Sequence, residues 1–272
     1  MPSWTVDARG RLDFDDVTAL NVRLMAGSVA VLASDDPPSL VVTELKGRPL
    51  QVTQEGGELT ISYESLSWEG LLGFLKPRHD SVVVTITVPA DCPIQLGVLS
   101  ASAIVSGLQS GAAVKGMSGD VTLDGVAGNV EAEPMSGEIA ARDIDGEVRF
   151  KSMSGGLVLA DGWLDRLEAN TMSGQIAADV TLREKGDVHV STMSGDVTLR
   201  LPAGSDAEVR LQSTSGAVRS EFESLRSVKA PASHTVSGNV GAGTGRVSVS
   251  TMSGSVTLLR RLRREGKESE TR

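Results

Sequence analysis

Met117-Ser118-Gly119-Asp120-Val121-Thr122-Leu123 joins a three-residue signature, Met-Ser-Gly, to a run in which apolar and polar residues alternate. The other copies of the signature begin at Met135, Met153, Met172, Met193 and Met252, and the six glycines are Gly119, Gly137, Gly155, Gly174, Gly195 and Gly254. Two degenerate copies, Thr214-Ser215-Gly216 and Val236-Ser237-Gly238, complete a series with spacings of 18, 18, 19, 21, 21, 22 and 16 residues. Six of the chain's 8 methionines lie in this signature, so the pattern is an internal repeat.

Each repeat contains two short alternating runs. In the first repeat Val121 and Leu123 belong to one run, and Val130 and Ala132 belong to the other. A period of two is typical of strands with one buried face. No part of this region keeps a 3.6-residue period for three turns, which excludes alternating strands and helices.

Two strands and two bends per repeat fit two architectures. In antiparallel hairpins, Asp124-Gly125, Asp145-Gly146 and Asp161-Gly162 would supply the turns. In a parallel β-solenoid each repeat is one coil, and coils rise by about 4.8 Å. We favour the solenoid, because near-identical triplets are expected where equivalent residues stack on one another. It predicts a methionine column filling the core, a Ser-Gly column at a corner, and right-handed coils.

Residues 1–99 lack the signature but are rich in short apolar runs bounded by turn residues. We expect an all-β region that covers the first coil of a solenoid spanning residues 100–258, because an open coil would expose unpaired backbone. The expected strands are 11–14, 20–25, 29–32, 40–45, 50–54, 58–63 and 82–88.

An apolar insertion, residues 66–78, interrupts this region. Its large apolar side chains are Trp68, Leu71, Leu72, Phe74 and Leu75. Most of them lie at helical spacing, although Gly70 and Gly73 weaken a helix prediction. The insertion is interpreted either as a lid over the core or as a docking patch for a partner or a membrane surface.

The chain is acidic, with net charge −9, but ends in a basic tail, residues 259–272. The tail is interpreted as solvated and frayed, or alternatively as a contact with anionic membrane. An acidic chain is a poor ligand for nucleic acid, so none is expected. The N-terminus lacks the features of a signal peptide and no apolar run could cross a bilayer, which predicts a cytoplasmic protein.

Residues that could support catalysis or metal binding are few. Cys92 is the single cysteine, and His79, His189 and His234 are not paired at metal-ligand spacing, so each is expected to face solvent. No nucleophile elbow, Walker A loop or dinucleotide fingerprint is present. We therefore expect no enzyme activity and no cofactor.

Acidic residues cluster in residues 117–150. Stacked coils would place Asp120 beside Glu138, an arrangement that costs energy unless a cation or a basic partner relieves it. A solvated acidic face is the favoured interpretation. Calcium bound at Asp143, Asp145 and Glu147 is the alternative, although their spacing matches no known calcium loop.

The repeat resembles a known family. Copies of Ser-Gly-x-Val/Ile-x-Leu/Ala alternate with Gly-x-Val-x-Ala/Val after a leading strand, residues 83–89. Over residues 20–258 this pattern resembles the bacterial "putative adhesin" β-strand-repeat family, a domain of unknown function with members in cell-envelope-stress operons. Trp4-Thr5-Val6 and Trp68-Glu69-Gly70 are similar to an actinobacterial subgroup. The resemblance implies a right-handed β-helix and offers no catalytic residues to transfer.

The functional hypothesis is a non-catalytic β-helical scaffold or interaction protein, linked to cell-envelope stress or surface homeostasis. Its partner is an unidentified protein or a second copy of the chain. The first alternative is a self-assembling filament subunit similar to bactofilins. A polysaccharide-active β-helix enzyme is a third alternative, disfavoured because the loops are too short to build a cleft.

Overall fold

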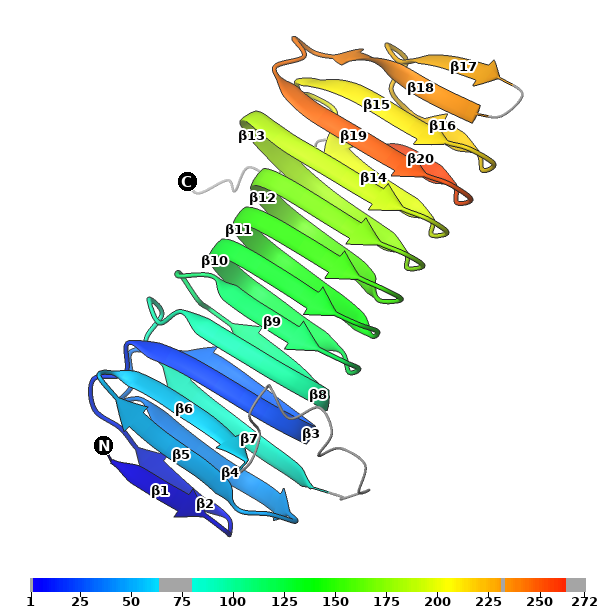
Figure 1. The fold of residues 1–272 in the computed structure, drawn as a ribbon. Coiled ribbons are helices and arrows are strands. Elements are labelled where there is room, and N and C mark those ends of the chain that lie inside the picture. The colour runs from blue at the N-terminus through cyan, green and yellow to red at the C-terminus, as the bar shows by residue number, and fades with distance from the viewer. Residues whose placement is uncertain (1, 64–79, 231–232, 263–272) are drawn as a thin grey trace, which may run out of the picture.

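The alternating runs of the repeat form strands that stack in parallel (Figure 1). In this computed structural model, which describes residues 2–63, 80–230 and 233–262, one coil is one long strand. The central coils are β10 (Val121–Pro134), β11 (Glu138–Ser152) and β12 (Gly156–Thr171). Their register sets Val121 beside Ile139, and Ile139 beside Leu157. The parallel β-solenoid is therefore confirmed, and the hairpin alternative is wrong for these coils.

Each coil bends twice, once at Met-Ser-Gly and once in the middle of its long strand. The Asp-Gly pairs that suggested hairpins lie at this second bend. Gly125, Gly146 and Asp161 have positive φ angles of 63°, 133° and 53° there. Asp and Gly adopt this backbone region more readily than other residues. The same residues that make a hairpin turn therefore serve to carry the chain from one side of the coil to the other.

The core is a set of stacked columns between the two sides of the solenoid. One column runs Leu123, Ala141, Leu159, Ala178 and Leu199, so large and small side chains alternate from coil to coil. In another, Phe150 is fully buried between Ala132 and Ala169. Alternation of this kind fills a narrow interior without voids.

Parallel stacking begins much earlier than residue 100. The two expected strands 20–25 and 29–32 are one strand, β3 (Ala19–Ala33), which forms a complete coil. It pairs in parallel with β8 (Ile94–Ser106) from Leu20 to Leu32, and β8 pairs in turn with β9 (Ala112–Gly116) and β10. The first 99 residues thus contribute a coil of the solenoid as well as its cap.

In the cap, strand pairing changes from parallel beside β3 to antiparallel at the end of the molecule. They are β1 (Ser3–Val6), β2 (Gly10–Asp13), β4 (Ser39–Lys46), β5 (Leu50–Glu55), β6 (Glu58–Tyr63) and β7 (Ser81–Val88). Strands β6 and β7 lie parallel to β3, whereas β5 and β4 pair with them in antiparallel fashion. Strands β1 and β2 close the end, antiparallel to β5 and β4. The expected N-terminal cap is confirmed.

At the other end, strand order departs from chain order. The strands are β13 (Ile176–Thr192), β14 (Val197–Pro202), β15 (Ala207–Ser213), β16 (Val218–Ser220), β17 (Arg226–Ala230), β18 (Ser233–Val240), β19 (Gly245–Thr251) and β20 (Val256–Arg261). Strand β19 lies between β13 and β15, and β20 lies between β14 and β16. The last coil of the sequence is thus inserted inside the stack, while β18 and β17 close this end with antiparallel pairing (Figure 1).

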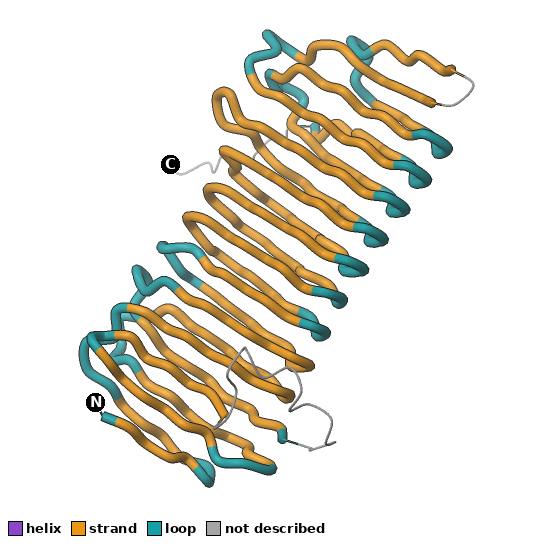
Figure 2. The backbone as a smooth tube through the Cα atoms, in the orientation of Figure 1, coloured by secondary structure: helices purple, strands orange, loops and turns teal. Residues whose placement is uncertain are grey.

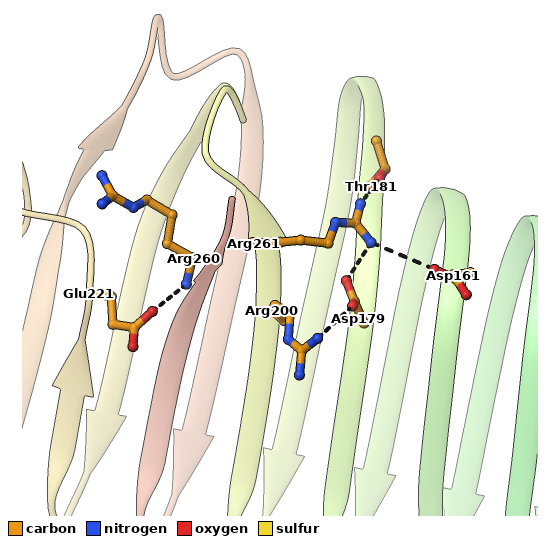
Figure 3. A network of polar contacts seen from close by, with 7 residues as sticks. All are labelled: Asp161, Asp179, Thr181, Arg200, Glu221, Arg260 and Arg261. Carbon is orange, nitrogen blue, oxygen red and sulfur yellow. Dashed lines mark hydrogen bonds and ion pairs between the residues drawn. The ribbon is translucent and has the colours of Figure 1, made fainter. Parts of the chain in front are cut away.

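Arg261 fastens the inserted coil (Figure 3). Its guanidinium donates to the Asp179 carboxylate and to the Thr181 hydroxyl, each at 2.6 Å. Arg200 also donates to Asp179, at 3.3 Å. Residues 259–261, expected in the basic tail, therefore belong to β20, and residues 263–272 lie outside the described residues. No helix in the described part of the chain is long and apolar enough to span a membrane.

Candidate functional site

The Met-Ser-Gly corners form one edge of the solenoid, seen in Figure 2 as a row of turns that follow consecutive strands. The methionine side chains on this edge are between 48% and 57% exposed. The expectation that they fill the core is wrong. Strand alternation gives the reason, because Val188, Val190 and Thr192 face inward and Met193 must then face outward. Extending the alternation by one residue would have predicted this from sequence.

The position before four of the six methionines carries a hydroxyl group that sequence reasoning missed. These residues are Ser152, Thr171, Thr192 and Thr251, with Ser213 at the degenerate corner. The Ser152 hydroxyl accepts a hydrogen bond from the Gly155 backbone N–H at 2.7 Å, and Thr251 accepts one from Gly254 at 3.1 Å. Ser and Thr commonly close turns in this way. The signal in the sequence was the recurrence of Ser or Thr immediately before Met.

The serines of the signature tie consecutive corners together, as expected. The backbone N–H of Ser136 donates to the Met117 carbonyl at 3.0 Å, and the Ser136 hydroxyl donates to the same oxygen at 3.0 Å. Equivalent backbone bonds repeat along the edge. These bonds hold consecutive corners one strand spacing apart, which is about 4.8 Å.

The inserted C-terminal coil keeps the methionine column continuous. The Ser253 N–H donates to the Met193 carbonyl at 3.0 Å, and the Ser215 N–H donates to the Met252 carbonyl at 3.0 Å. Met252 therefore lies next to Met193, and the degenerate Thr214 corner lies beyond it. Val236-Ser237-Gly238 is not a corner at all, because it lies within β18. The six methionines thus stack in the spatial order 117, 135, 153, 172, 193 and 252, and we call this surface the methionine edge.

An open groove of about 520 Å³ runs along part of the methionine edge. Its lining consists of Lys151, Ser152, Asn170, Thr171, Met172, Ser191, Thr192, Met193 and Met252. The Thr192 Oγ1 atom is buried and has no hydrogen-bond partner. Thr192 faces inward, so this hydroxyl lies beneath the Gly195 corner and not on the exposed side of the groove.

Part of the acidic cluster is paired within the fold. The Asp120 carboxylate accepts the Glu138 backbone N–H at 2.9 Å, which offsets the repulsion expected between these stacked residues. Asp124 pairs with Arg142 at 3.8 Å, and Asp145 pairs with Arg183. Among the described residues, no group of three or more His, Cys, Asp or Glu side chains could hold a metal ion. Asp143, Asp145 and Glu147 are not such a group, and calcium binding there stays a sequence-based alternative.

In each coil, one strand segment leads into the Met-Ser-Gly corner. The outer face formed by these segments carries charges of alternating sign. Arg149 donates to Glu168 at 3.4 Å, and Lys115 pairs with Glu133 at 2.8 Å. The hydrogen bond to Glu133 raises the pKa of Lys115. A cavity of about 290 Å³ on this face includes Ser110, whose Oγ atom is buried without a partner. Paired charges along the strands indicate a solvated face.

The described histidines differ from each other. His189 is exposed, as expected, in an outward position between Glu168 and Ser248 in the neighbouring strands. His234 was expected to face solvent but is half-buried and bridges strands instead. Its Nδ1 accepts the Val218 backbone N–H at 3.1 Å, and its Nε2 lies 2.9 Å from the Ser227 hydroxyl. It therefore has a structural role at the C-terminal end. His79 lies outside the described residues.

The apolar insertion also lies outside the described residues, which end at Tyr63 and resume at Asp80. Its five large residues, Trp68, Leu71, Leu72, Phe74 and Leu75, are therefore not placed. Both interpretations of this segment, lid and docking patch, remain sequence-based predictions.

Stacked coils, capped at both ends and exposing one column of repeated side chains, define a β-solenoid protein built from an internal repeat. The chain belongs to the Toastrack DUF4097 family, whose model matches residues 17–259. This family is a domain of unknown function, in agreement with the resemblance drawn from the repeat. No curated protein matches the chain.

The chain is also similar to solved structures from several bacteria. A "putative lipid binding protein" from Parabacteroides distasonis is 19% identical, with coverage of 93% of this chain and 96% of its own and a TM-score of 0.46. A "putative adhesin" from Bacteroides fragilis is 14% identical, with coverage of 93% and 96% and a TM-score of 0.44. A "putative cell adhesion protein" from Clostridium sporogenes is 9% identical, with coverage of 93% and 99% and a TM-score of 0.23.

Proposed function

We propose that this protein is a non-catalytic binding scaffold that holds a partner protein along the methionine edge. The observation that carries the proposal is the continuous column of six methionines, each about half exposed on a rigid frame. Methionine is flexible and polarizable, so it adapts to varied apolar partners. Isolated exposed apolar residues are ordinary on protein surfaces, but a contiguous row of them is typical of an interaction site.

The occupant we propose is an extended apolar segment of the partner. Six corners spaced by about 4.8 Å make an edge roughly 24 Å long, which an extended segment of about seven residues would cover. The corner backbone groups that could pair with another strand already bond to the neighbouring corners. Recognition would therefore rely on side-chain contact with the methionines rather than on strand addition. A cytoplasmic location and a role in cell-envelope stress belong to the same proposal and rest on the sequence and the resemblance alone.

The filament alternative is less well supported. A solenoid that polymerises end to end needs a parallel coil available at each end. Here β1 and β2 close one end with antiparallel pairing, and β17 closes the other. Strand β17 also places Arg226 and Lys229 in exposed positions, and charged edge strands oppose further pairing. A single discrete species in size-exclusion chromatography and electron microscopy is expected, whereas concentration-dependent rods would favour the filament.

Paired variants test the docking edge. Met153→Lys, Met172→Lys and Met193→Lys together place three charges on the methionine edge. A control carries Ile104→Lys and Val158→Lys, which are 50% and 41% exposed but lie in the strands that follow the corners. We expect a partner cross-linked in the native host, then purified, to bind the wild type and the control and to lose at least tenfold affinity for the methionine variant. Equal binding to all three proteins would refute the proposal.

A further inference from the structure

We propose that the methionine edge binds the soft monovalent cations Cu(I) and Ag(I) through the thioether sulfurs of methionines in consecutive coils. The ligand differs from the apolar partner proposed above, so the two proposals stand independently. The site centres on Met172, Met193 and Met252, which line the same groove.

The spacing of the corners suits a shared ion. Backbone hydrogen bonds of 3.0 Å hold the Met172, Met193 and Met252 corners in sequence. Neighbouring strands are about 4.8 Å apart. Metal–sulfur bonds such as those of zinc are about 2.3 Å long, so two sulfurs on either side of one ion lie up to about 4.6 Å apart. Methionine side chains have three rotatable bonds, which is enough freedom for neighbouring sulfurs to reach this separation.

The donor chemistry selects the metal. Thioethers are neutral and soft, and such ligands favour Cu(I) over hard cations such as Mg²⁺ or Ca²⁺. Zinc and calcium are usually bound by carboxylate, imidazole or thiol groups, and no such group lines this groove. Of the atoms that line the groove, the three methionine sulfurs are the donors that suit a soft ion.

The charge of the lining narrows the position of the ion further. Lys151 is the single charged group in the lining and would repel a cation. It lies in the coil farthest from Met252, so we place the first ion between Met193 and Met252.

The topology supports this arrangement. Chain order would place Thr214 beside Met193, which would end the sulfur column at five residues. Insertion of β19 and β20 between β13–β14 and β15–β16 instead places Met252 there. The inserted coil thus completes the three-methionine groove.

Titration with the ions themselves tests the site. The protein is prepared with Cys92→Ala, because a thiol would also bind these ions, and is titrated with Ag(I) and, under anaerobic conditions, with Cu(I) against a competing chelator. Native mass spectrometry counts bound ions and calorimetry gives affinity. We expect at least one ion per chain, with Zn²⁺ and Ca²⁺ at the same concentrations failing to displace it.

Isosteric variants assign the sulfurs. Met172→Leu, Met193→Leu and Met252→Leu together keep the size and apolar character of the edge, so circular dichroism and melting temperature should match those of the parent protein. We expect at least a tenfold loss of affinity for both ions, whereas Met25→Leu, outside the column, keeps full binding. Absence of binding to the parent protein, or undiminished binding to the triple variant, would overturn the proposal. An apolar partner would still bind the leucine variant, so failure of this proposal is distinguishable from failure of the docking proposal.

Discussion

The carbonyl oxygen of Gly195 occupies the space that a Cβ atom on Gly254 would need. The two glycines lie in adjacent coils although β14 to β19 separate them in the chain. Gly216 stacks on Gly254 in the same way, and Gly155 on Gly137, where the carbonyl oxygen is 2.7 Å from the ideal Cβ position. Glycine recurs at these corners because consecutive backbones approach too closely for any side chain.

Replacing Gly195 should therefore destabilise the solenoid at its centre. Its ideal Cβ would overlap the Gly174 carbonyl oxygen, which is backbone and cannot rotate away. We expect Gly195→Ala to lower the free energy of unfolding by about 1–3 kcal/mol or more, as other overpacked sites do. Urea denaturation measures the loss. Gly204→Ala is the matched control, because no atom lies within 4 Å of its ideal Cβ, and a comparable loss there would contradict the packing argument.

The Arg261 clasp should contribute to the stability of the inserted coil. Arg261 is 31% exposed and Asp179 is 19% exposed, so their hydrogen bond is partly shielded from water. We expect Arg261→Ala to cost about 1.5–3 kcal/mol, the usual range for hydrogen bonds to charged groups. Thermal unfolding measures this loss. Arg260→Ala serves as control because Arg260 contacts Glu221 through its backbone N–H, and equal destabilisation by both variants would show that the clasp is unimportant.

Phe150 should be the most costly aromatic residue to truncate within the central coils. It is fully buried, and the adjoining residues of its column, Ala132 and Ala169, are too small to fill the space it would leave. We expect Phe150→Ala to lower stability by about 3–5 kcal/mol. Phe150→Leu should cost less, since it leaves a smaller cavity. A loss below 1 kcal/mol for the alanine variant in urea denaturation would mean that neighbouring coils collapse onto the site.

The buried Cys92 thiol should react slowly with reagents, and its ionisation should destabilise the fold at alkaline pH. Burial, with a smaller effect of the Asp91 charge, raises the pKa of the Cys92 thiol to about 11. Burial also raises the pKa of Tyr63 to about 12. At pH values between the ordinary pKa of each group and its raised one, the unfolded chain releases a proton that the folded chain retains. The stability associated with the protonated groups is therefore present below their ordinary pKa values and is lost as pH rises toward 11 and 12.

The rate at which a disulfide reagent modifies Cys92 at pH 8 tests the burial and the raised pKa of the thiol. Because only the thiolate reacts, native Cys92 should be modified at least about a hundredfold more slowly than the urea-unfolded chain. Melting temperature should fall steadily above pH 9. Rapid labelling of the native protein at pH 8 would show that the thiol is accessible and its pKa ordinary.

The repeat was enough to predict strands, corners and parallel stacking, because each depends on a few adjacent residues. Val121 and Leu123 face inward as their alternation indicated, and Gly119 lies at a corner. The position of Met117 was predicted wrongly because its apolar character was weighed above strand alternation. The ion pairs that neutralise Asp124 and Asp145 join residues 18 and 38 positions apart, so local patterns gave no account of them.

The sequence by itself determined that the chain folds into like coils, since alternation and a repeated Met-Ser-Gly corner are local properties of each repeat. Only the tertiary structure decided the order of the last coils and, with it, the partner of Met193. Chain order favours Thr214 as that partner, but pairing on both sides of β19 and β20 buries their apolar residues and satisfies their backbone groups. That gain is a property of the assembled stack, because it depends on a gap that exists only after the neighbouring coils have formed.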